Sequence, residues 1–158
     1  MKNILFTLAL LISFSSFGQI KSFNDIKNIN SIQEFHRVCI ENGYTFIAKE
    51  GYISYGVGLN KDKSKATDWA TYYDGIYSTN EWLFEEHGVE WKRDNGGSYY
   101  DKIFEEVKKQ CSFFEIQKEG GDNMACYSCP NSKYKGKICF YIEAQYNTGT
   151  IKHSITTE

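Results

Sequence analysis

The chain has 158 residues, and its 18 Lys and Arg against 20 Asp and Glu give a formal net charge of −2. That near balance argues against a nucleic-acid binder, which needs a basic surface, and against a polybasic membrane-surface protein. The 41% hydrophobic and 16% aromatic content excludes a disordered chain, and the single Pro excludes a proline-rich one. The length fits one domain better than two.

The first eighteen residues have the three parts of a secretory signal peptide. Lys2 gives a positive start, residues 4–14 form an apolar run, and residues 15–18 supply small side chains at the −3 and −1 positions before Gln19. The run is shorter than the roughly 20 apolar residues of a membrane-spanning helix. The pattern is typical of bacterial export signals, although an N-terminal core helix or strand is the alternative. We therefore expect cleavage after Gly18, a single α+β domain over 19–158 without a membrane span, and a periplasmic or extracellular location.

The first predicted helix covers residues 31–42. Its apolar residues recur at helical spacing on one stripe, and Ser31 and Glu34 have the spacing of a capping box. Gly43 then fits the position after a helix C-terminus. Strands are expected at 44–48 and 52–57, separated by the Glu50-Gly51 turn, and at 66–73 and 76–84, which flank Asp74-Gly75.

The second predicted helix covers residues 98–111, with Ser98 at the N-cap and one continuous apolar stripe. Further strands are expected near 113–116, 123–129, 137–146 and 150–155. A helix followed by a strand, a Lys-Glu-Gly turn and a strand occurs twice, about seventy residues apart. The expected fold class is α+β: an antiparallel sheet of about seven or eight strands in hairpins or meanders, with two amphipathic helices on one face. Two helix-plus-meander repeats are one interpretation of this pattern, and coincidental turn chemistry is the other.

Five cysteines remain after the predicted cleavage, and an exported chain meets conditions in which disulfides persist. A hairpin turn centred on Tyr134 would place Cys129 opposite Cys139, both pointing away from the core. The same register turns Cys126 inward, toward Cys111 at the end of the second helix. We therefore expect the bonds Cys129–Cys139 and Cys111–Cys126, with Cys39 as a buried free thiol.

Cys126 and Cys129 also form a CxxC motif, for which redox catalysis and zinc binding are alternatives. A redox-active motif normally begins a helix, whereas the residues around this one are typical of a strand and a turn. Zinc would need further ligands, for which Cys111 and Cys139 are available, but oxidation competes outside the cytoplasm. Structural disulfides are favoured, and no metal or cofactor is expected.

Glu81, Glu85 and His87 are the candidates for an enzymatic site. Two carboxylates four residues apart beside a histidine could perform acid–base chemistry. The alternative is an edge segment with solvated acids, because carboxylates are mostly exposed. The sequence contains no HExxH motif and no local triad signature.

Aromatic residues are concentrated in the middle strands, and Trp69, Tyr72, Tyr73 and Trp82 are the candidates for a binding surface. Strand alternation places Trp69 and Tyr73 on one face and Tyr72 on the other. Cross-strand packing that stabilises the sheet is the alternative. The leading hypothesis is an extracytoplasmic, non-enzymatic domain that binds a protein or small ligand through its sheet, such as an inhibitor or immunity-type envelope protein. A small secreted enzyme using Glu81, Glu85, His87 or the CxxC motif is the alternative.

Overall fold

The structure is a computed structural model that describes residues 20–49, 51–73, 79–95, 97–119, 121–129 and 136–156. The predicted signal peptide and the Asp74-Gly75 turn lie outside these residues. The first half of the fold contains α2 (Phe23–Lys27), α3 (Ile32–Glu41), β1 (Thr45–Lys49), β2 (Tyr52–Val57), β3 (Asp68–Tyr73) and β4 (Thr79–His87). The second half contains α4 (Val89–Asp94), α5 (Tyr99–Gln110), β5 (Ser112–Glu119), β6 (Asp122–Ser128), β7 (Gly136–Glu143), the 3-10 turn η1 (Ala144–Tyr146) and β8 (Thr148–Thr156).

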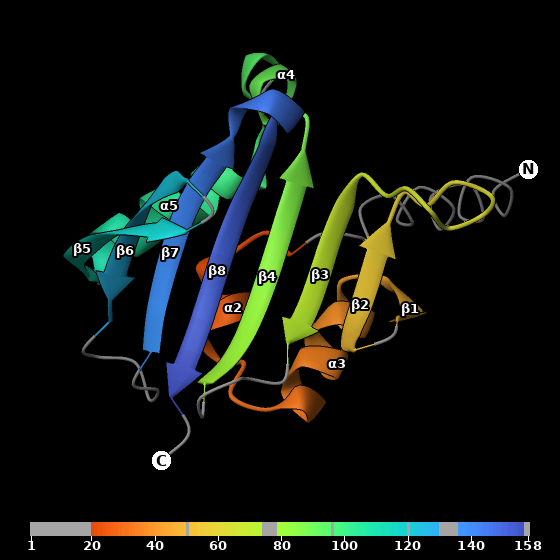
Figure 1. The fold of residues 1–158 in the computed structure, drawn as a ribbon, viewed down its shortest axis with the longest axis horizontal. Helices are drawn as coiled ribbons and strands as arrows, with labels where there is room; N and C mark the ends of the chain where they lie inside the picture. Colours follow the sequence, from red (N-terminus) through yellow and green to blue (C-terminus); the bar gives the residue numbers. More distant parts are fainter. Residues whose placement is uncertain are drawn as a thin grey trace, which may run out of the picture.

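The eight strands form one antiparallel sheet in the order β1-β2-β3-β4-β8-β7-β6-β5 (Figure 1). This order confirms the predicted α+β class and its eight-strand sheet. Each half is a pair of helices followed by a four-stranded meander, so the element order repeats in the way that the helix-plus-meander interpretation of the turn pattern requires. Sequence periodicity found α3 and α5 but not α2 and α4, because five or six residues are too few to establish a helical period.

Serine side chains begin the two long helices, as predicted. Ser31 Oγ accepts a hydrogen bond from the Glu34 amide, and Ser98 Oγ accepts one from the Asp101 amide. Each bond satisfies one of the helix N–H groups that lack an intrahelical partner. Such caps are typically worth about 1 kcal/mol each.

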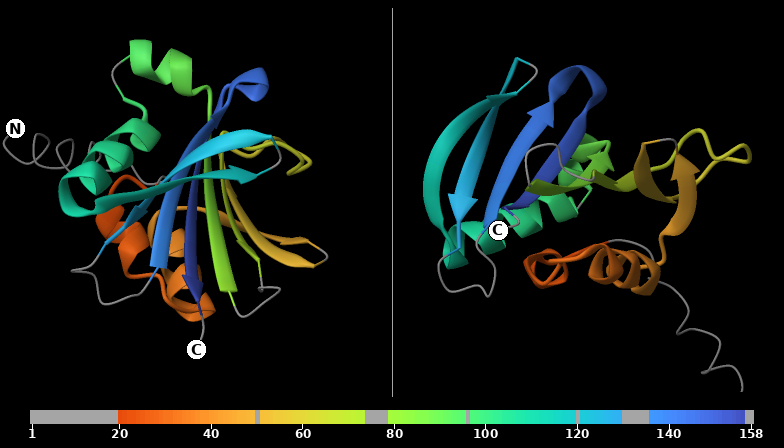
Figure 2. Two further views of the ribbon diagram at one scale, coloured as in Figure 1. Left: turned by 60° about the vertical axis from the view of Figure 1, so that its left-hand side comes forward. Right: turned by 60° about the horizontal axis from the view of Figure 1, so that its bottom comes forward.

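The helices α2, α3 and α5 cover one face of the sheet, and the opposite face carries none of the described helices (Figure 2). The core lies between these layers. Its largest fully buried side chains include Phe35 on α3, Ile103 on α5, and Trp82, Phe84 and Ile151 on the central strands. Burying a side chain of this size contributes roughly 1.5–3 kcal/mol.

Buried charges join the two halves at one end of β4. The carboxylate of Glu86 accepts hydrogen bonds from Ser98 Oγ at 3.0 Å and from the backbone amides of Tyr99 and Tyr100 at 3.3 and 2.8 Å. A carboxylate therefore accepts hydrogen bonds from the backbone amides in the first turn of α5. Negative charge at this position is favourable because a helix N-terminus carries partial positive charge. Lys92 forms ion pairs with Glu86 and Asp68, both at 3.1 Å, which compensates both buried acids.

The cysteine pairing differs from the expected one. Bonds join Cys111 to Cys129 and Cys126 to Cys139, so the predicted pairs Cys129–Cys139 and Cys111–Cys126 are wrong. Cys39 forms no disulfide and is buried in α3, as expected. Burial raises the pKa of the Cys39 thiol, which therefore remains protonated at physiological pH.

A displaced hairpin register explains the exchange of partners. Cys126, rather than Cys129, lies directly opposite Cys139. The displacement of three residues is odd, and an odd shift moves every side chain of β6 to the other face of the sheet. Cys129 consequently lies on the core side with Cys111. The outward direction predicted for Cys139 is confirmed, since its neighbours Ile138 and Phe140 belong to the core.

An approximate two-fold relation connects the two halves. β4 and β8 each contain nine residues, and their middle residues, Leu83 and Lys152, are direct partners. The repeat axis therefore passes between these two side chains. Residues that lie the same number of strands outward from the Leu83–Lys152 pair occupy equivalent positions in the two halves. Thr71 on β3 therefore matches Cys139 on β7, and Ser54 on β2 matches Cys126 on β6.

Candidate functional site

The helix-free face of the sheet is concave, because the strands at both ends of the sheet curve away from the helices (Figure 2). Ser54, Thr71 and Thr150 point to this face and are at most 5% exposed, although none of the described helices covers them. The curvature lets side chains of neighbouring strands shield them. A single row of paired residues crosses the whole face, one from each strand: Ile47, Ser54, Thr71, Leu83, Lys152, Cys139, Cys126 and Glu115.

A half-open cavity of about 260 Å³ lies near the middle of this face. Its lining consists of Tyr73, Glu81, Leu83, Tyr141 and Lys152. These residues come from β3, β4, β7 and β8, which are the four central strands and belong to both halves. The cavity therefore lies on the approximate two-fold axis and exists only because β4 and β8 are paired.

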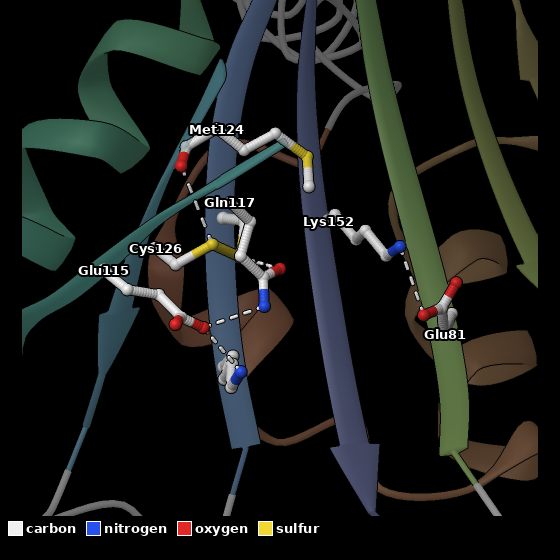
Figure 3. Close-up of a disulfide and its surroundings, with 8 residues drawn as sticks. Glu81, Glu115, Gln117, Met124, Cys126 and Lys152 are labelled. Carbon is white, nitrogen blue, oxygen red and sulfur yellow. Dashed lines mark hydrogen bonds and ion pairs between the residues drawn. A yellow bond between two sulfur atoms is a disulfide. The ribbon is translucent and has the colours of Figure 1, made fainter. Parts of the chain in front are cut away.

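An ion pair forms one part of the cavity lining. Lys152 extends from β8 to Glu81 on β4, and the distance from Nζ to Oε1 is 3.2 Å (Figure 3). The Lys152 side chain is 11% exposed and the Glu81 side chain is 33% exposed. The carboxylate, rather than the ammonium, is thus the more accessible end of the pair.

Tyr73 and Tyr141 occupy corresponding positions on the two sides of the cavity. Tyr73 lies opposite Glu81 on β4, and Tyr141 lies opposite Thr150, the residue of β8 that corresponds to Glu81. Partial burial raises the pKa of the Tyr73 hydroxyl, and the negative charge of Glu85 raises it further. The hydroxyl therefore stays protonated and can donate a hydrogen bond at neutral pH.

The disulfide between Cys126 and Cys139 borders the cavity region on the side of β6 and β7. It packs with Met124 and Tyr141 in a small apolar cluster, separate from the main core. Figure 3 shows Met124 and Cys126 on one side of Lys152 and Glu81 on the other. Beyond the disulfide, Lys137 donates to Glu115 at 2.7 Å, which lowers the pKa of that carboxyl. The face thus combines an apolar patch with two ion pairs.

The predicted aromatic surface is divided between the two faces. Trp69 and Tyr73 point to the concave face, on the side that alternation assigned to them. Tyr72 and Trp82 are direct partners that belong to the core, with exposures of 8% and 0%, so their assignment to a binding surface is wrong. The cross-strand packing alternative applies to this pair, whose ring centroids are 5.7 Å apart.

The residues proposed for an enzymatic site do not converge on the cavity. Glu81, Glu85 and His87 share one face of β4, but four residues along a strand separate the two carboxylates by about 13 Å. The cavity lining includes Glu81 and neither of the other two. His87 instead contacts Thr148 through Nδ1 at 2.8 Å, and burial lowers its pKa.

The CxxC motif is divided between two disulfides, since Cys126 bonds to Cys139 and Cys129 to Cys111. It lies on β6 and the residue that follows, not at the beginning of a helix. A dithiol catalyst closes its bond within the motif, whereas both sulfurs here bridge to other elements. The described residues contain no group of three or more His, Cys, Asp or Glu side chains that could hold a metal.

Sequence reasoning missed Leu83, Tyr141 and Lys152 as cavity residues. Alternation in β8 and β7 gives the direction of each side chain, but not which strand lies beside β4. The pairing of β4 with β8 joins residues about seventy positions apart, and no local signal specifies it. The one available signal was the internal repeat, because equivalent meanders can pair through their equivalent last strands.

Comparison with known proteins gave no relative. The chain matches no family model, no curated protein and no solved structure. Among the described helices, none is both long and apolar enough to cross a membrane. The interpretation of function therefore rests on the geometry of the concave face.

Proposed function

We propose that this is an exported, non-enzymatic binding protein that holds a partner protein against the concave face of its sheet. The observation that supports this proposal most strongly is the difference between the two faces of the sheet. Helices α2, α3 and α5 cover one face, whereas the other is concave and contains a cavity at its centre. An inhibitor or immunity-type protein of the cell envelope would use such a surface.

The dimensions of the face support a protein partner. Eight strands at about 4.8 Å spacing span roughly 34 Å, and the nine-residue central strands extend roughly 30 Å. This footprint of about 1,000 Å² compares with the approximately 800 Å² that each partner contributes to a standard protein–protein interface. The cavity is smaller than the roughly 300–1,000 Å³ of sites for drug-sized ligands. It fits one side chain within a larger interface better than a separate small-molecule site.

Two disulfides support the export part of the proposal, because such bonds persist in oxidising compartments and are rare in the cytoplasm. The predicted signal peptide supports it independently. Mass spectrometry of the cell-associated protein should find a chain that begins at Gln19 and carries two disulfides. An intact Met1 with five reduced cysteines would contradict export.

The binding part is tested by photo-crosslinking in living cells. A benzophenone amino acid replaces Trp69 on the concave face in one variant and Lys102 on the exposed side of α5 in a matched control. The proposal predicts one adduct of reproducible mass from position 69 and none from position 102. Equal labelling from both positions, or labelling only from position 102, would contradict it.

A further inference from the structure

We infer that the central cavity is the site at which the partner protein inserts a basic side chain, with the guanidinium group of arginine as the best fit. This inference rests on the proposed function, because it names the chemistry of the partner at the middle of the same face. Three features of the cavity lining point to that chemistry.

The first feature is an available acceptor. Glu81 forms an ion pair with Lys152 through Oε1, at 3.2 Å, and its side chain remains 33% exposed. An ionised carboxylate offers about four lone-pair sites, so Oε2 can still accept two hydrogen bonds. A guanidinium group carries five N–H donors and no acceptor, which complements that oxygen.

The second feature is the pair of tyrosines. Tyr73 and Tyr141 are on β3 and β7, three strand spacings apart, which leaves about 14 Å between their backbones. Aromatic faces attract cations, and arginine stacks on them more readily than lysine does. Tyrosine and arginine are also the side chains most often found at the energetic centre of protein interfaces.

The third feature is the charge around the cavity. Glu81 and Glu85 both act on the Tyr73 hydroxyl with negative charge. Lys152 is the one basic residue of the lining, but its side chain is largely buried and its charge is directed at Glu81. The more exposed charge of the lining is therefore the Glu81 carboxylate. An acidic guest would meet the Glu81 carboxylate without a compensating accessible cation.

The direct test uses capped amino acids as probes of the purified protein. Tyrosine-ring ¹H–¹³C spectra are recorded during titration with Nα-acetyl-arginine methylamide and, separately, with Nα-acetyl-glutamate methylamide. We expect saturable shifts of the Tyr73 and Tyr141 signals with the arginine probe only, while the exposed Tyr146 on η1 is unaffected. Shifts with the glutamate probe alone, or with neither probe, would overturn the inference.

Two variants should change the dissociation constant of the arginine probe in opposite directions. Glu81→Gln removes the acceptor charge and leaves Lys152, so the dissociation constant for the arginine probe should rise by roughly tenfold or more, the equivalent of about 1.4 kcal/mol. Lys152→Met leaves the carboxylate without its internal partner, so the same constant should fall. Glu90→Gln, on the exposed surface of α4, is the matched control and should leave it unchanged. Equal constants for Glu81→Gln and wild type would overturn the inference.

The crosslinking assay separates this inference from the proposed function. The benzophenone at position 69 is combined with Glu81→Gln or with Glu90→Gln, and the yield of the adduct should fall only with the former. If the adduct persists with Glu81→Gln and the arginine probe does not bind the protein, the proposed binding face stands and the inferred role of the cavity is overturned. Probe binding without any adduct would contradict insertion by a partner protein.

Discussion

At the scale of single residues, the fold contains a buried histidine whose burial has consequences for stability. His153 lies on β8 against the helix layer, with 0% exposure, and its Nε2 donates to the carbonyl of Ile29 at 3.0 Å. Burial lowers the pKa of His153 from 6.5 to about 4. The folded chain thus keeps this side chain neutral under conditions in which the unfolded chain protonates it.

This residue should make stability depend on pH between about 6.5 and about 4. Below pH 6.5 the unfolded chain binds a proton that the folded chain excludes, so stability is complete above this window and falls as the pH decreases through it. The loss from one such group is at most about 1.4 kcal/mol per pH unit. Urea unfolding at several pH values gives the free energy of unfolding as a function of pH. Between pH 6.5 and about 4 this free energy should change less steeply with pH for His153→Asn than for wild type. The same pH dependence of the unfolding free energy in both proteins would show that folding does not prevent protonation of His153.

Ser54 and Thr71 are a second residue pair with a defined role. Their hydroxyl oxygens are 2.9 Å apart on the concave face, and both side chains are buried. The approximate two-fold relation places them where the other half has Cys126 and Cys139. A hydrogen bond and a disulfide therefore join equivalent strand pairs in the two halves.

At the scale of elements, this equivalence predicts that the double change Ser54→Cys and Thr71→Cys forms a third disulfide, between β2 and β3. The two positions are direct partners, 17 residues apart in sequence. A loop of this length should stabilise the fold by about 3 kcal/mol. Thiol titration of the oxidised, denatured variant should find only Cys39, and the urea midpoint should increase. Three titratable thiols, or a lower midpoint than Thr71→Cys alone, would contradict the equivalence.

Local chemistry predicted the elements well, and for identifiable reasons. The serine caps, the apolar stripes and the alternation of Trp69, Tyr72 and Tyr73 are all encoded within a few neighbouring residues. The hairpin register was not encoded in this way. A displacement of three residues in β6 exchanged the disulfide partners, because alternation gives relative orientation and leaves the register open.

The candidate site was only partly predictable for the same reason. Trp69, Tyr73 and Glu81 were identified from their own strands, whereas Tyr141 and Lys152 are brought to the cavity by the pairing of β4 with β8. This pairing is a long-range contact that depends on the whole fold. The wrong assignment of Trp82 to a binding surface has a different cause. The local sequence around an aromatic residue in a strand is the same whether that residue lies in the core or on the surface.

At the scale of the whole molecule, the two halves provide one continuous surface. The first half contributes α2 and α3 to the covered face and the second half contributes α5, each half supplies four strands to the concave face, and the cavity forms at their junction. The halves differ in how they are reinforced, since the described disulfides both belong to the second half. The cavity lies between the two halves, where both could contact one partner.

The most direct test of the binding face is hydroxyl-radical footprinting of the protein in its own cellular compartment and after purification. Tyr73 reports on the concave face, and Tyr146, which is 63% exposed on η1, reports on the surface outside it. Our account predicts that Tyr73 is oxidised severalfold more slowly in the cell than in the purified protein, while Tyr146 reacts equally in both. Equal rates for Tyr73 in the two settings, or protection of Tyr146 instead, would contradict it.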